Sequence, residues 1–328
     1  MFKAVITGVA GQDGSYLAEN LLLKGYQVIG ITRRKSVTPC LDNLINVMDN
    51  PNFKLIYGDV NDSTLIYRIL VTHQPYEWYN LAASSNVGQS FKEPTATFKI
   101  NAEAVITQLD AIKEISPSTR YYQASTSELW GGEKCPITGF DENSIFHPRS
   151  PYGVSKLAAY WSVRNYRESY GLFACNGLLS NHSSSRRGHD FATRKITKGV
   201  AAVKLGIQNK VKLGNLDAFR DEGHSKDYVE AMYLMLQKEA PQDYVIATGT
   251  GATIKEMLAY VCELADLNID NVYEQDPQFL RPSDVPYLKG NPEKAKQELG
   301  WVPTYSWKNL LKEMYLNDLE LLKNKKGE

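Results

Sequence analysis

The sequence has few cysteines, no excess of charge of either sign and no long apolar run. Its four cysteines, Cys40, Cys135, Cys175 and Cys262, lie far apart without a C-x-x-C pair, which argues against a disulfide framework and a zinc site. The five histidines show no metal-ligand spacing, so we expect no metal. Lysine plus arginine and aspartate plus glutamate both number 37, and this balance gives no reason to expect binding to nucleic acid.

Membrane association is not indicated either. The start, MFKAVITG, enters a strand pattern at once, without the basic and apolar regions of a signal peptide. No apolar run approaches the roughly 18 residues that a spanning helix needs, and the only basic run is the short tail KNKKG. We therefore expect a cytoplasmic protein without a membrane partner.

The first 170 residues alternate short β-rich runs with longer helical patterns. The expected strands are FKAVIT, YQVIGIT, FKLIYG, EWYNLA and RYYQAS, and apolar residues at helical spacing begin near Gly14, Asp62, Pro94 and Pro151. Repeated alternation of strand and helix is typical of a parallel sheet with helices on both faces. The sequence therefore predicts an α/β protein with a Rossmann-like, doubly wound parallel sheet.

The regular alternation of strands and helices ends beyond LFACNGLLS. An arginine-bearing polar loop leads to a helix, the short strand KVKLGN, a helix around KDYVEAMYLML, the strand DYVIATG and further helices. We assign residues 1–180 to a dinucleotide-binding Rossmann domain, with contributions from about residues 214–248. Residues 181–328 are assigned to a smaller α/β substrate-binding lobe that is interleaved with the end of the first domain.

Three glycines directly follow the first predicted strand. In ITGVAGQDGSYL, Gly8, Gly11 and Gly14 are spaced G-x-x-G-x-x-G at the opening of a helix, and Gln12 and Asp13 lie in the same turn. Glycines let the backbone turn tightly and approach a pyrophosphate, and the helix N-terminus supplies free N–H groups and a positive dipole end. The pattern predicts a dinucleotide site, with a plain strand-to-helix turn as the alternative.

The residues after the second strand bear on the choice of cofactor. NAD-binding proteins carry an acidic residue there for the ribose hydroxyls, whereas GITRRKS carries Arg33 and Arg34. Because the guanidinium fork binds phosphate oxygens bidentately, we predict NADP, with ordinary surface arginines as the alternative. Asp59 and Val60, at the end of the third strand, are placed to meet the adenine.

The loop after the fourth strand, NLAASS, is made of small residues. Small side chains allow a backbone to approach a cofactor closely. We therefore count Leu81, Ala83 and Ser85 among the candidate cofactor contacts.

A tyrosine and a lysine lie four residues apart in SPYGVSK. On a helix, Tyr152 and Lys156 share one face. A free tyrosine has a pKa of about 10, and a nearby ammonium together with a positive nicotinamide would lower the pKa of Tyr152 enough for it to act as a base. Tyr-x-x-x-Lys is common on helices. Here it follows a glycine-rich dinucleotide loop, which makes it a stronger indication of a catalytic tyrosine and lysine.

The fifth strand ends in polar residues. YYQASTSELWGG carries Thr126 and Glu128 two residues apart, where they emerge on one side if the strand stays extended. Ligands of doubly wound sheets bind beyond the carboxyl ends of the strands, and an ionised carboxylate at the mouth of an apolar sheet is costly unless it is used. We therefore expect Glu128 to face the site; a helix cap or a solvated loop carboxylate is the alternative.

Together these motifs resemble the extended short-chain dehydrogenase/reductases and, within them, the GDP-mannose 4,6-dehydratase family over nearly the whole chain. The resemblance is carried by TGVAGQDGSYLAENLLLKGY, the RR pair, YQASTSELW, HPRSPYGVSKLAAYW, NH with RRG, KDYVEAM and RPSDV. It implies an NADP-dependent internal redox reaction that removes water from GDP-mannose and gives GDP-4-keto-6-deoxymannose, a step of deoxysugar biosynthesis on the way to GDP-fucose. It also implies a homodimer or homotetramer.

The same resemblance assigns roles to individual residues. Thr126, Glu128 and Tyr152 take the catalytic places, and Lys156 holds the cofactor. Further cofactor contacts are expected from His182 and Arg187, and substrate contacts from Ser85, Glu128, Asn181, Lys195, Arg220 and Arg281. The chain departs from the family pattern at Ser84, Asn86, Ser183, Ser185 and Glu222. These departures lie near the cofactor loop or the sugar-nucleotide pocket and leave the identity of the sugar open.

Two other interpretations stay open. Another nucleotide-sugar dehydratase, epimerase or reductase of the same superfamily would also use Tyr152 and Lys156, although a reductase or 4-epimerase needs no acid or base at position 128. A dinucleotide-sensing binding protein with an inactive site is the alternative from a different class. The presence of Thr126 and Glu128 beside the tyrosine and lysine argues against it.

Overall fold

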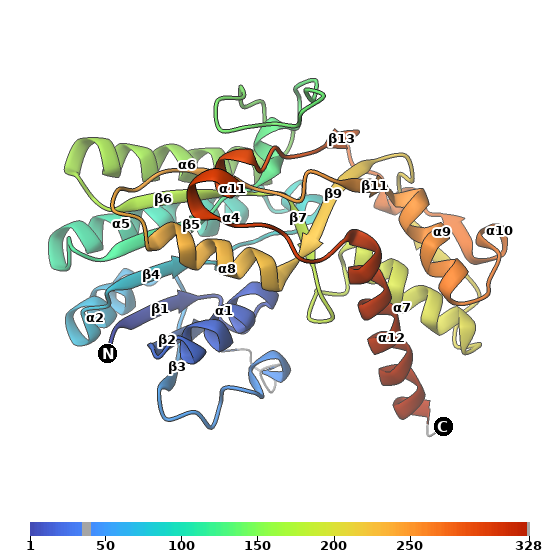
Figure 1. Ribbon diagram of the computed structural model, residues 1–328, viewed down its shortest axis with the longest axis horizontal. Helices are drawn as coiled ribbons and strands as arrows, with labels where there is room; N and C mark the ends of the chain where they lie inside the picture. Colours follow the sequence, from blue (N-terminus) through green and yellow to red (C-terminus); the bar gives the residue numbers. More distant parts are fainter. Residues whose placement is uncertain (35–40, 327–328) are drawn as a thin grey trace.

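The computed structural model describes residues 1–34 and 41–326, and their centre is a parallel sheet (Figure 1). Seven strands follow the order β10-β6-β5-β4-β1-β2-β3, and each neighbouring pair is parallel. They are β1 (Lys3–Thr7), β2 (Gln27–Thr32), β3 (Phe53–Tyr57), β4 (Glu77–Asn80), β5 (Arg120–Ala124), β6 (Ala174–Leu179) and β10 (Tyr244–Ile246). The predicted α/β, doubly wound sheet is confirmed.

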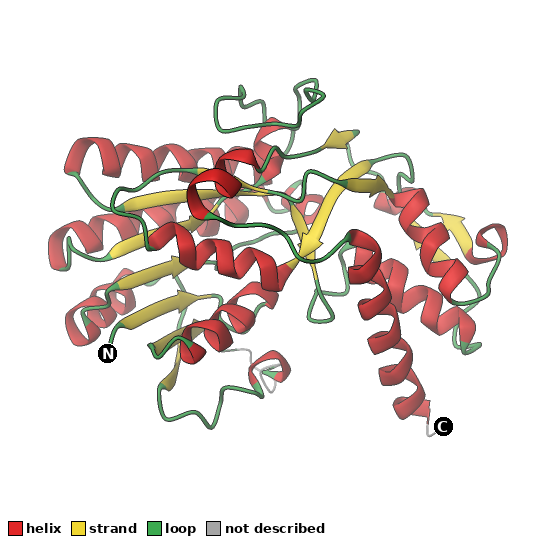
Figure 2. Ribbon diagram, in the orientation of Figure 1, coloured by secondary structure: helices red, strands yellow, loops and turns green. Residues whose placement is uncertain are grey.

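Helices cover both faces of this sheet, as Figure 2 shows. The larger ones are α1 (Gln12–Leu23) and α8 (Ser225–Leu236) on one face, and α2 (Ser63–His73), α5 (Ala104–Ile115) and α6 (Pro151–Tyr170) on the other. Successive strand residues point to opposite cores: Ile6 packs with the α1 and α8 side chains, and its neighbour Val5 packs with those of α2, α5 and α6. Burial on both faces explains why most strand residues are apolar. The buried polar ones, such as Glu77, Asn80 and Gln123, take part in hydrogen bonds with other buried side chains.

Short helical segments lie along the carboxyl edge of the sheet and around it. They are η1 (Asp42–Leu44), α3 (Val87–Ser90), α4 (Pro94–Phe98), the π-helical η2 (Lys99–Glu103) and η3 (Ser127–Trp130). The long helix α6 has clear local signals at both ends: the Ser150 hydroxyl accepts a hydrogen bond from the N–H of Gly153, Pro151 occupies the first turn, and Gly171 ends the helix with φ +68°. These signals fix where Tyr152 stands, at the start of the helix.

A second lobe lies beyond the carboxyl ends of the strands (Figure 1). Its sheets contain β7 (Asn181–Ser183), β9 (Phe219–His224), β11 (Gly251–Thr253) and β13 (Tyr287–Leu288), and separately β8 (Val211–Leu213) and β12 (Tyr273–Gln275). Its helices are α7 (Ala192–Lys204), α9 (Ile254–Leu264), α10 (Ile269–Val272), η4 (Pro277–Phe279) and α12 (Trp307–Lys326). An apolar core formed mainly by α7, α9 and α12 holds the lobe together.

The chain passes back and forth between the two lobes. Within residues 214–248, β9 belongs to the small sheet, whereas α8 and β10 return to the first domain. The exchange continues further along the chain, because Ala295 of α11 (Glu293–Leu299) and Trp301 share the core of α1 and α8. The Trp301 indole N–H donates to the carbonyl of Asp227 at 2.7 Å, which fixes this return.

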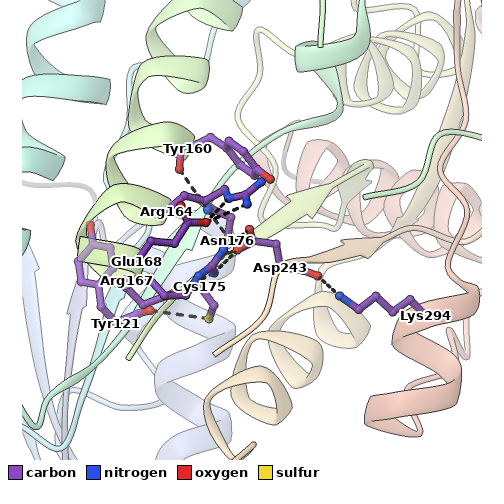
Figure 3. A network of polar contacts seen from close by, with 10 residues as sticks. Tyr121, Tyr160, Arg164, Arg167, Glu168, Cys175, Asn176, Asp243 and Lys294 are labelled. Carbon is purple, nitrogen blue, oxygen red and sulfur yellow. Dashed lines mark hydrogen bonds and ion pairs between the residues drawn. The ribbon is translucent and has the colours of Figure 1, made fainter. Parts of the chain in front are cut away.

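A buried polar network around Asp243 ties the returning segments to α6 (Figure 3). The Asp243 carboxylate accepts two hydrogen bonds from the Arg167 guanidinium, at 2.8 and 2.9 Å, and one from the backbone N–H of Asn176 at 2.7 Å. Lys294 of α11 donates to the backbone carbonyl of Asp243 at 2.8 Å. Bidentate pairing of this kind is geometrically specific, so the network fixes β10 and α11 against the helix that carries Tyr152.

Within residues 1–34 and 41–326, no helix is long and apolar enough to cross a membrane. The cytoplasmic location stays a prediction.

Candidate active site

The glycine turn after β1 has the shape that a pyrophosphate requires. A Cβ on Gly8 would lie 2.9 Å from the backbone nitrogen of Ala82, and one on Gly14 would lie 2.4 Å from the carbonyl oxygen of Gly8. Gly8 also has φ +71°, where side chains are strained. Helix α1 begins at Gln12 without a side-chain cap on Gly11, so its first N–H groups are left for a ligand. The turn therefore fits a dinucleotide.

Asp13 and His182, both predicted cofactor residues, contact each other. His182 Nε2 lies 2.9 Å from Asp13 Oδ2, and Nδ1 lies 2.8 Å from the Ser180 carbonyl oxygen. Burial alone would raise the pKa of Asp13, but the charge of His182 and its hydrogen bond help to lower that pKa to about 2. Gln12 donates to the His182 carbonyl at 3.2 Å and accepts from the Ser184 hydroxyl at 3.0 Å. The glycine turn is thereby joined to β7 and the loop that follows it.

The residues predicted to contact the adenosine half of the cofactor lie at the ends of β2 and β3. The N–H of Gly8 donates a hydrogen bond to the backbone carbonyl of the penultimate residue of β2 at 2.9 Å. The end of β2 therefore adjoins the glycine turn. Arg33 and Arg34 follow directly and are exposed. Asp59 is half-buried and Val60 is buried after β3. Both arginines thus lie at the same sheet edge, where the Arg34 guanidinium is 5.9 Å from the centre of the Tyr57 ring.

The loop after β4 lies against the glycine turn. The Thr7 hydroxyl oxygen accepts hydrogen bonds from the N–H groups of Leu81, at 3.1 Å, and Ala82, at 3.0 Å. Ala83 is half-buried and Ser85 is exposed. The loop is thus held at its base and presents small side chains beyond it.

The four residues predicted to carry out the chemistry meet at the carboxyl end of β5. Thr126, Glu128, Tyr152 and Lys156 are all buried, with between 3% and 8% of their surface exposed. The Lys156 ammonium donates to the carbonyl of Ala124 at 2.8 Å and lies 6.0 Å from the centre of the Tyr152 ring. Burial of a carboxyl, a phenol and an amine in one place is unusual outside functional sites.

The local backbone here differs from the sequence-based expectation. Strand β5 ends at Ala124 and does not stay extended through Glu128, because Thr126 caps the helical turn η3 and its hydroxyl accepts from the N–H of Glu128 at 3.2 Å. Thr126, not Glu128, is therefore the cap residue. Glu128 reaches the site from the first turn of η3, and its carboxylate lies 3.6 Å from the Arg281 guanidinium.

The pKa values of the buried tyrosine and lysine are set mainly by their burial. Burial raises the pKa of Tyr152 to about 12; the Thr126 hydroxyl and the Arg187 charge oppose this rise without overcoming it. Burial lowers the pKa of Lys156 to about 8. The residues around Tyr152 therefore raise its pKa and do not bring about the expected lowering. A positive charge placed beside the phenol would oppose this rise.

The cations predicted to contact substrate gather around one segment, residues 276–284. Arg220 Nη2 and Arg281 Nη1 lie 3.8 and 3.9 Å from the same Asp284 oxygen. The Lys195 ammonium lies 3.6 Å from the centre of the Phe279 ring. Burial lowers the pKa of Arg220. Sequence analysis did not single out Asp284 or Phe279, although the RPSDV motif contains Asp284 beside Arg281.

The remaining predicted substrate contacts, and residues that depart from the family pattern, lie at β7 with its neighbour β9 and at the start of α3. Asn181 pairs in register with Glu222 of the neighbouring strand β9. The buried Glu222 carboxylate accepts a hydrogen bond from the Ser183 hydroxyl, so these two departures from the family pattern contact each other. Ser85 is exposed and precedes Asn86, whose side chain caps α3 by accepting from a backbone N–H at 3.0 Å.

Among the residues that the structure describes, no group of three or more His, Cys, Asp or Glu side chains is placed to hold a metal ion.

The fold and the site define the class of the protein, the extended short-chain dehydrogenase/reductases. Solved structures with this fold include dTDP-glucose 4,6-dehydratase from Bacillus anthracis in complex with NAD, which is 22% identical with a TM-score of 0.85 over 99% of this chain and 98% of the other. UDP-glucose 4-epimerase from Thermotoga maritima, with UDP-glucose, is 25% identical with a TM-score of 0.86 over 98% and 100%.

Sequence similarity narrows the class to one family. The family model for GDP-mannose 4,6 dehydratase matches residues 5–314, and the chain belongs to this family. GDP-mannose 4,6 dehydratase 1 of Arabidopsis thaliana is 46% identical over 332 residues, which cover 98% of this chain and 91% of the relative. The Homo sapiens and Yersinia enterocolitica enzymes of the same name are 44% and 43% identical, each over 98% of this chain and over 92% and 95% of their own length.

Proposed function

We propose that this chain converts GDP-mannose to GDP-4-keto-6-deoxymannose and water, with NADP retained as an internal hydride carrier. Family membership supports the reaction class. The observation that carries the proposal is the buried carboxylate of Glu128 beside Tyr152 at the carboxyl end of β5. A reductase or 4-epimerase needs the tyrosine and the lysine alone, whereas an elimination also needs a group that moves a proton at C5 and C6.

The residues of the chain divide the proton transfers between them. When bound, the nicotinamide supplies an acceptor for the C4 hydride of the sugar and later a donor of hydride to C6. Tyr152 takes the proton from the O4 hydroxyl, and Lys156, which has donor capacity beyond its bond to Ala124, holds the ribose of the cofactor. A ketone at C4 acidifies the neighbouring C5 proton, so that a carboxylate can remove it.

Glu128 performs the second half of the reaction. Its carboxylate accepts the C5 proton, and the resulting acid, directly or through the Thr126 hydroxyl, protonates the C6 hydroxyl so that it leaves as water. C6 then receives the hydride, and C5 receives a proton in place of the one that left with water; the proton that Tyr152 took from O4 balances this uptake. The Thr126 hydroxyl accepts a hydrogen bond from the backbone N–H of Glu128 at 3.2 Å and also contacts the Tyr152 hydroxyl, so it adjoins the residues proposed to move protons.

NADP is proposed over NAD because two exposed guanidinium groups, on Arg33 and Arg34, follow β2 where an acidic residue would bind ribose hydroxyls. His182, Asp13 and Gln12 serve the cofactor indirectly, since they join the glycine turn to the second lobe. Titration of the purified protein with each dinucleotide, followed by fluorescence, tests the preference. Equal dissociation constants for NADP and NAD would contradict it.

The sugar nucleotide is proposed to bind through its diphosphate to Arg220 and Arg281, with Lys195 and Asn181 nearby. Arginine forks bind phosphate oxygens with charge-assisted hydrogen bonds, and Arg281 Nη1 is buried without a hydrogen-bond partner among the described residues. Alanine at position 220 or 281 should raise KM strongly and leave the dissociation constant of NADP unchanged. Loss of cofactor binding instead would show that these arginines are misassigned.

A homodimer or homotetramer is proposed through the face of α4, α5 and α6. Phe98, Ile106, Val154 and Trp161 are 38–51% exposed on these neighbouring helices. Exposed apolar side chains on adjacent helices are typical of an association surface. Sedimentation velocity of the wild-type protein and of Trp161→Glu tests this; a wild-type monomer would contradict it.

Mass spectrometry of GDP-mannose incubated with the protein and NADP tests the reaction itself. The nucleotide sugar should lose the mass of one water. An isomer of unchanged mass would indicate an epimerase, and an unaltered substrate that still binds would indicate a binding protein.

A further inference from the structure

The loop between β7 and α7, residues 184–191, carries Arg187, one of the predicted cofactor contacts. The half-buried Arg187 guanidinium lies 3.8 Å from the centre of the Phe191 ring, at the end of the same loop. Burial raises the pKa of Tyr152, and the charge of Arg187 opposes this rise, so the guanidinium lies close to the tyrosine proposed as the base. The attachments of this loop therefore decide where Arg187 stands in the site.

The first half of the loop is attached to the first domain. The Ser184 hydroxyl donates a hydrogen bond to Gln12 Oε1 at 3.0 Å. The Arg186 guanidinium donates to the Ser15 hydroxyl at 3.0 Å and to the Glu19 carboxylate at 2.7 Å. All three partners belong to α1, so these contacts hold the loop against the helix that follows the glycine turn.

A second attachment connects the loop to the C-terminal helix. Arg194, in the first turn of α7, donates from Nη1 to the carbonyl oxygen of Ser185 in the loop, and its Nη2 lies 2.7 Å from Asp318 Oδ1 of α12. Arg194 and Asp318 are only 4% and 2% exposed. Helix α12 packs along α7 (Figure 1). A single buried guanidinium thus joins the loop to both helices.

Asp318 supplies the charge that keeps Arg194 in this position. The donors of a guanidinium form a rigid planar fork, so a carboxylate that holds one nitrogen also directs the other nitrogen at the Ser185 carbonyl. Burial lowers the pKa of Arg194, and the charge of Asp318 opposes this lowering. A buried arginine that loses its carboxylate partner carries an uncompensated charge. We expect it to turn towards water and release the loop.

We propose that Asp318 is a positioning residue for the cofactor site, because through Arg194 it fixes the loop that presents Arg187. This inference rests on the proposed function, since it assumes that Arg187 contacts NADP. It gives the C-terminal helix a part in cofactor affinity, although its core belongs to the second lobe.

A double-mutant cycle between Asp318 and Arg187, measured by fluorescence titration of the full chain with NADP, tests the proposal. Asp318→Asn keeps the size of the side chain and removes the charge that holds Arg194. It should weaken NADP binding roughly tenfold, within the range expected for residues of one hydrogen-bonded network. In the Arg187→Met background the same change should have little further effect, because the residue through which Asp318 acts is gone.

Thr197→Val is the matched control. The Thr197 hydroxyl donates to the other Asp318 oxygen at 2.7 Å, so this variant removes a hydrogen bond of Asp318 and leaves its pair with Arg194. It should bind NADP as the wild-type protein does. An equal loss from Asp318→Asn in both backgrounds would reveal a general effect on the fold and overturn the proposal, as would an equally large loss from Thr197→Val.

A variant that lacks both charges guards against misfolding of Asp318→Asn. Apolar residues of similar volume often replace a buried ion pair without loss of stability. Arg194→Met combined with Asp318→Leu should therefore fold, as circular dichroism would show, and should still bind NADP more weakly, because the Ser185 carbonyl has lost its donor. Wild-type affinity in this folded double variant would overturn the proposal.

The same titrations separate this inference from the proposed function. Unchanged NADP binding by Arg187→Met would count against the proposed cofactor contact itself, and the inference would fail with it. Weaker binding by Arg187→Met together with wild-type binding by Asp318→Asn would count against the inference alone.

Discussion

Replacement of Glu128 by glutamine should separate oxidation from elimination. Glutamine fills the same space in η3, and its amide oxygen can still face the Arg281 guanidinium, which lies 3.6 Å from the present carboxylate. It cannot accept the C5 proton. Tyr152 and Lys156 lie on α6 and stay in place. Loss of the Glu128 charge removes one of the causes that raise the pKa of Tyr152, so the first half of the reaction should still occur.

The expected magnitude follows from the role of a positioned acid and base. Such a group contributes about 10²- to 10⁴-fold, so product formation should fall by that factor, or by roughly 3–5 kcal/mol in activation free energy. The variant should accumulate reduced dinucleotide after GDP-mannose is added, which is followed by its absorbance. Tyr152→Phe is the control, because it should lose both the reduced dinucleotide and the product.

Isotope exchange adds a second measurement on the wild-type protein. In deuterated water, solvent deuterium should enter C5, because its proton passes through a carboxyl group, whereas the hydrogen moved from C4 to C6 should not exchange. Full dehydration by Glu128→Gln, or a product without deuterium at C5, would refute the reasoning. Glu128 would then be a buried carboxylate of η3 without a catalytic role, and the site would fit a reductase or epimerase.

Three further predictions concern the cofactor, the fold and the pH dependence of stability. Arg33→Ala should weaken NADP binding by roughly 1.5–3 kcal/mol, the value of a charge-assisted hydrogen bond, and leave NAD binding nearly unchanged in the same fluorescence titration. Asp243→Ala should lower the free energy of unfolding in urea by about 3–5 kcal/mol, since it leaves the Arg167 guanidinium without the acceptors it has at 2.8 and 2.9 Å. A loss below about 1 kcal/mol would show that this network does not stabilise the fold as proposed. Asp13→Asn should destabilise the protein by roughly 1–2 kcal/mol at pH 7. Because the pKa of Asp13 is lowered to about 2 by its contact with His182, that difference should be present above pH 4 and shrink as the pH falls towards 2, and a difference that grows with acid would contradict the assignment.

The sequence alone determined the features that depend on neighbouring residues. The alternation of mainly apolar strands and helical patterns predicted the parallel sheet, because strands that are buried on both faces carry mostly apolar side chains. Gly8 and Gly14 predicted the dinucleotide turn, since each stands where a Cβ would clash with backbone atoms. The spacing of Tyr152 and Lys156 placed both on one helix face, and Ser150 with Gly171 determined where that helix begins and ends.

Only the tertiary structure decided how distant segments meet. The sequence indicated a carboxylate at position 128, but its partner Arg281 comes from the second lobe, and the helical turn that carries Glu128 arises because Thr126 caps it. The return of Trp301 to the first core likewise has no local signal. Hydrophobic periodicity and turn residues report on the nearest few positions of the chain. Contacts between lobes depend instead on how whole elements pack, and the pairing of Glu128 with Arg281 became visible only when that packing was known.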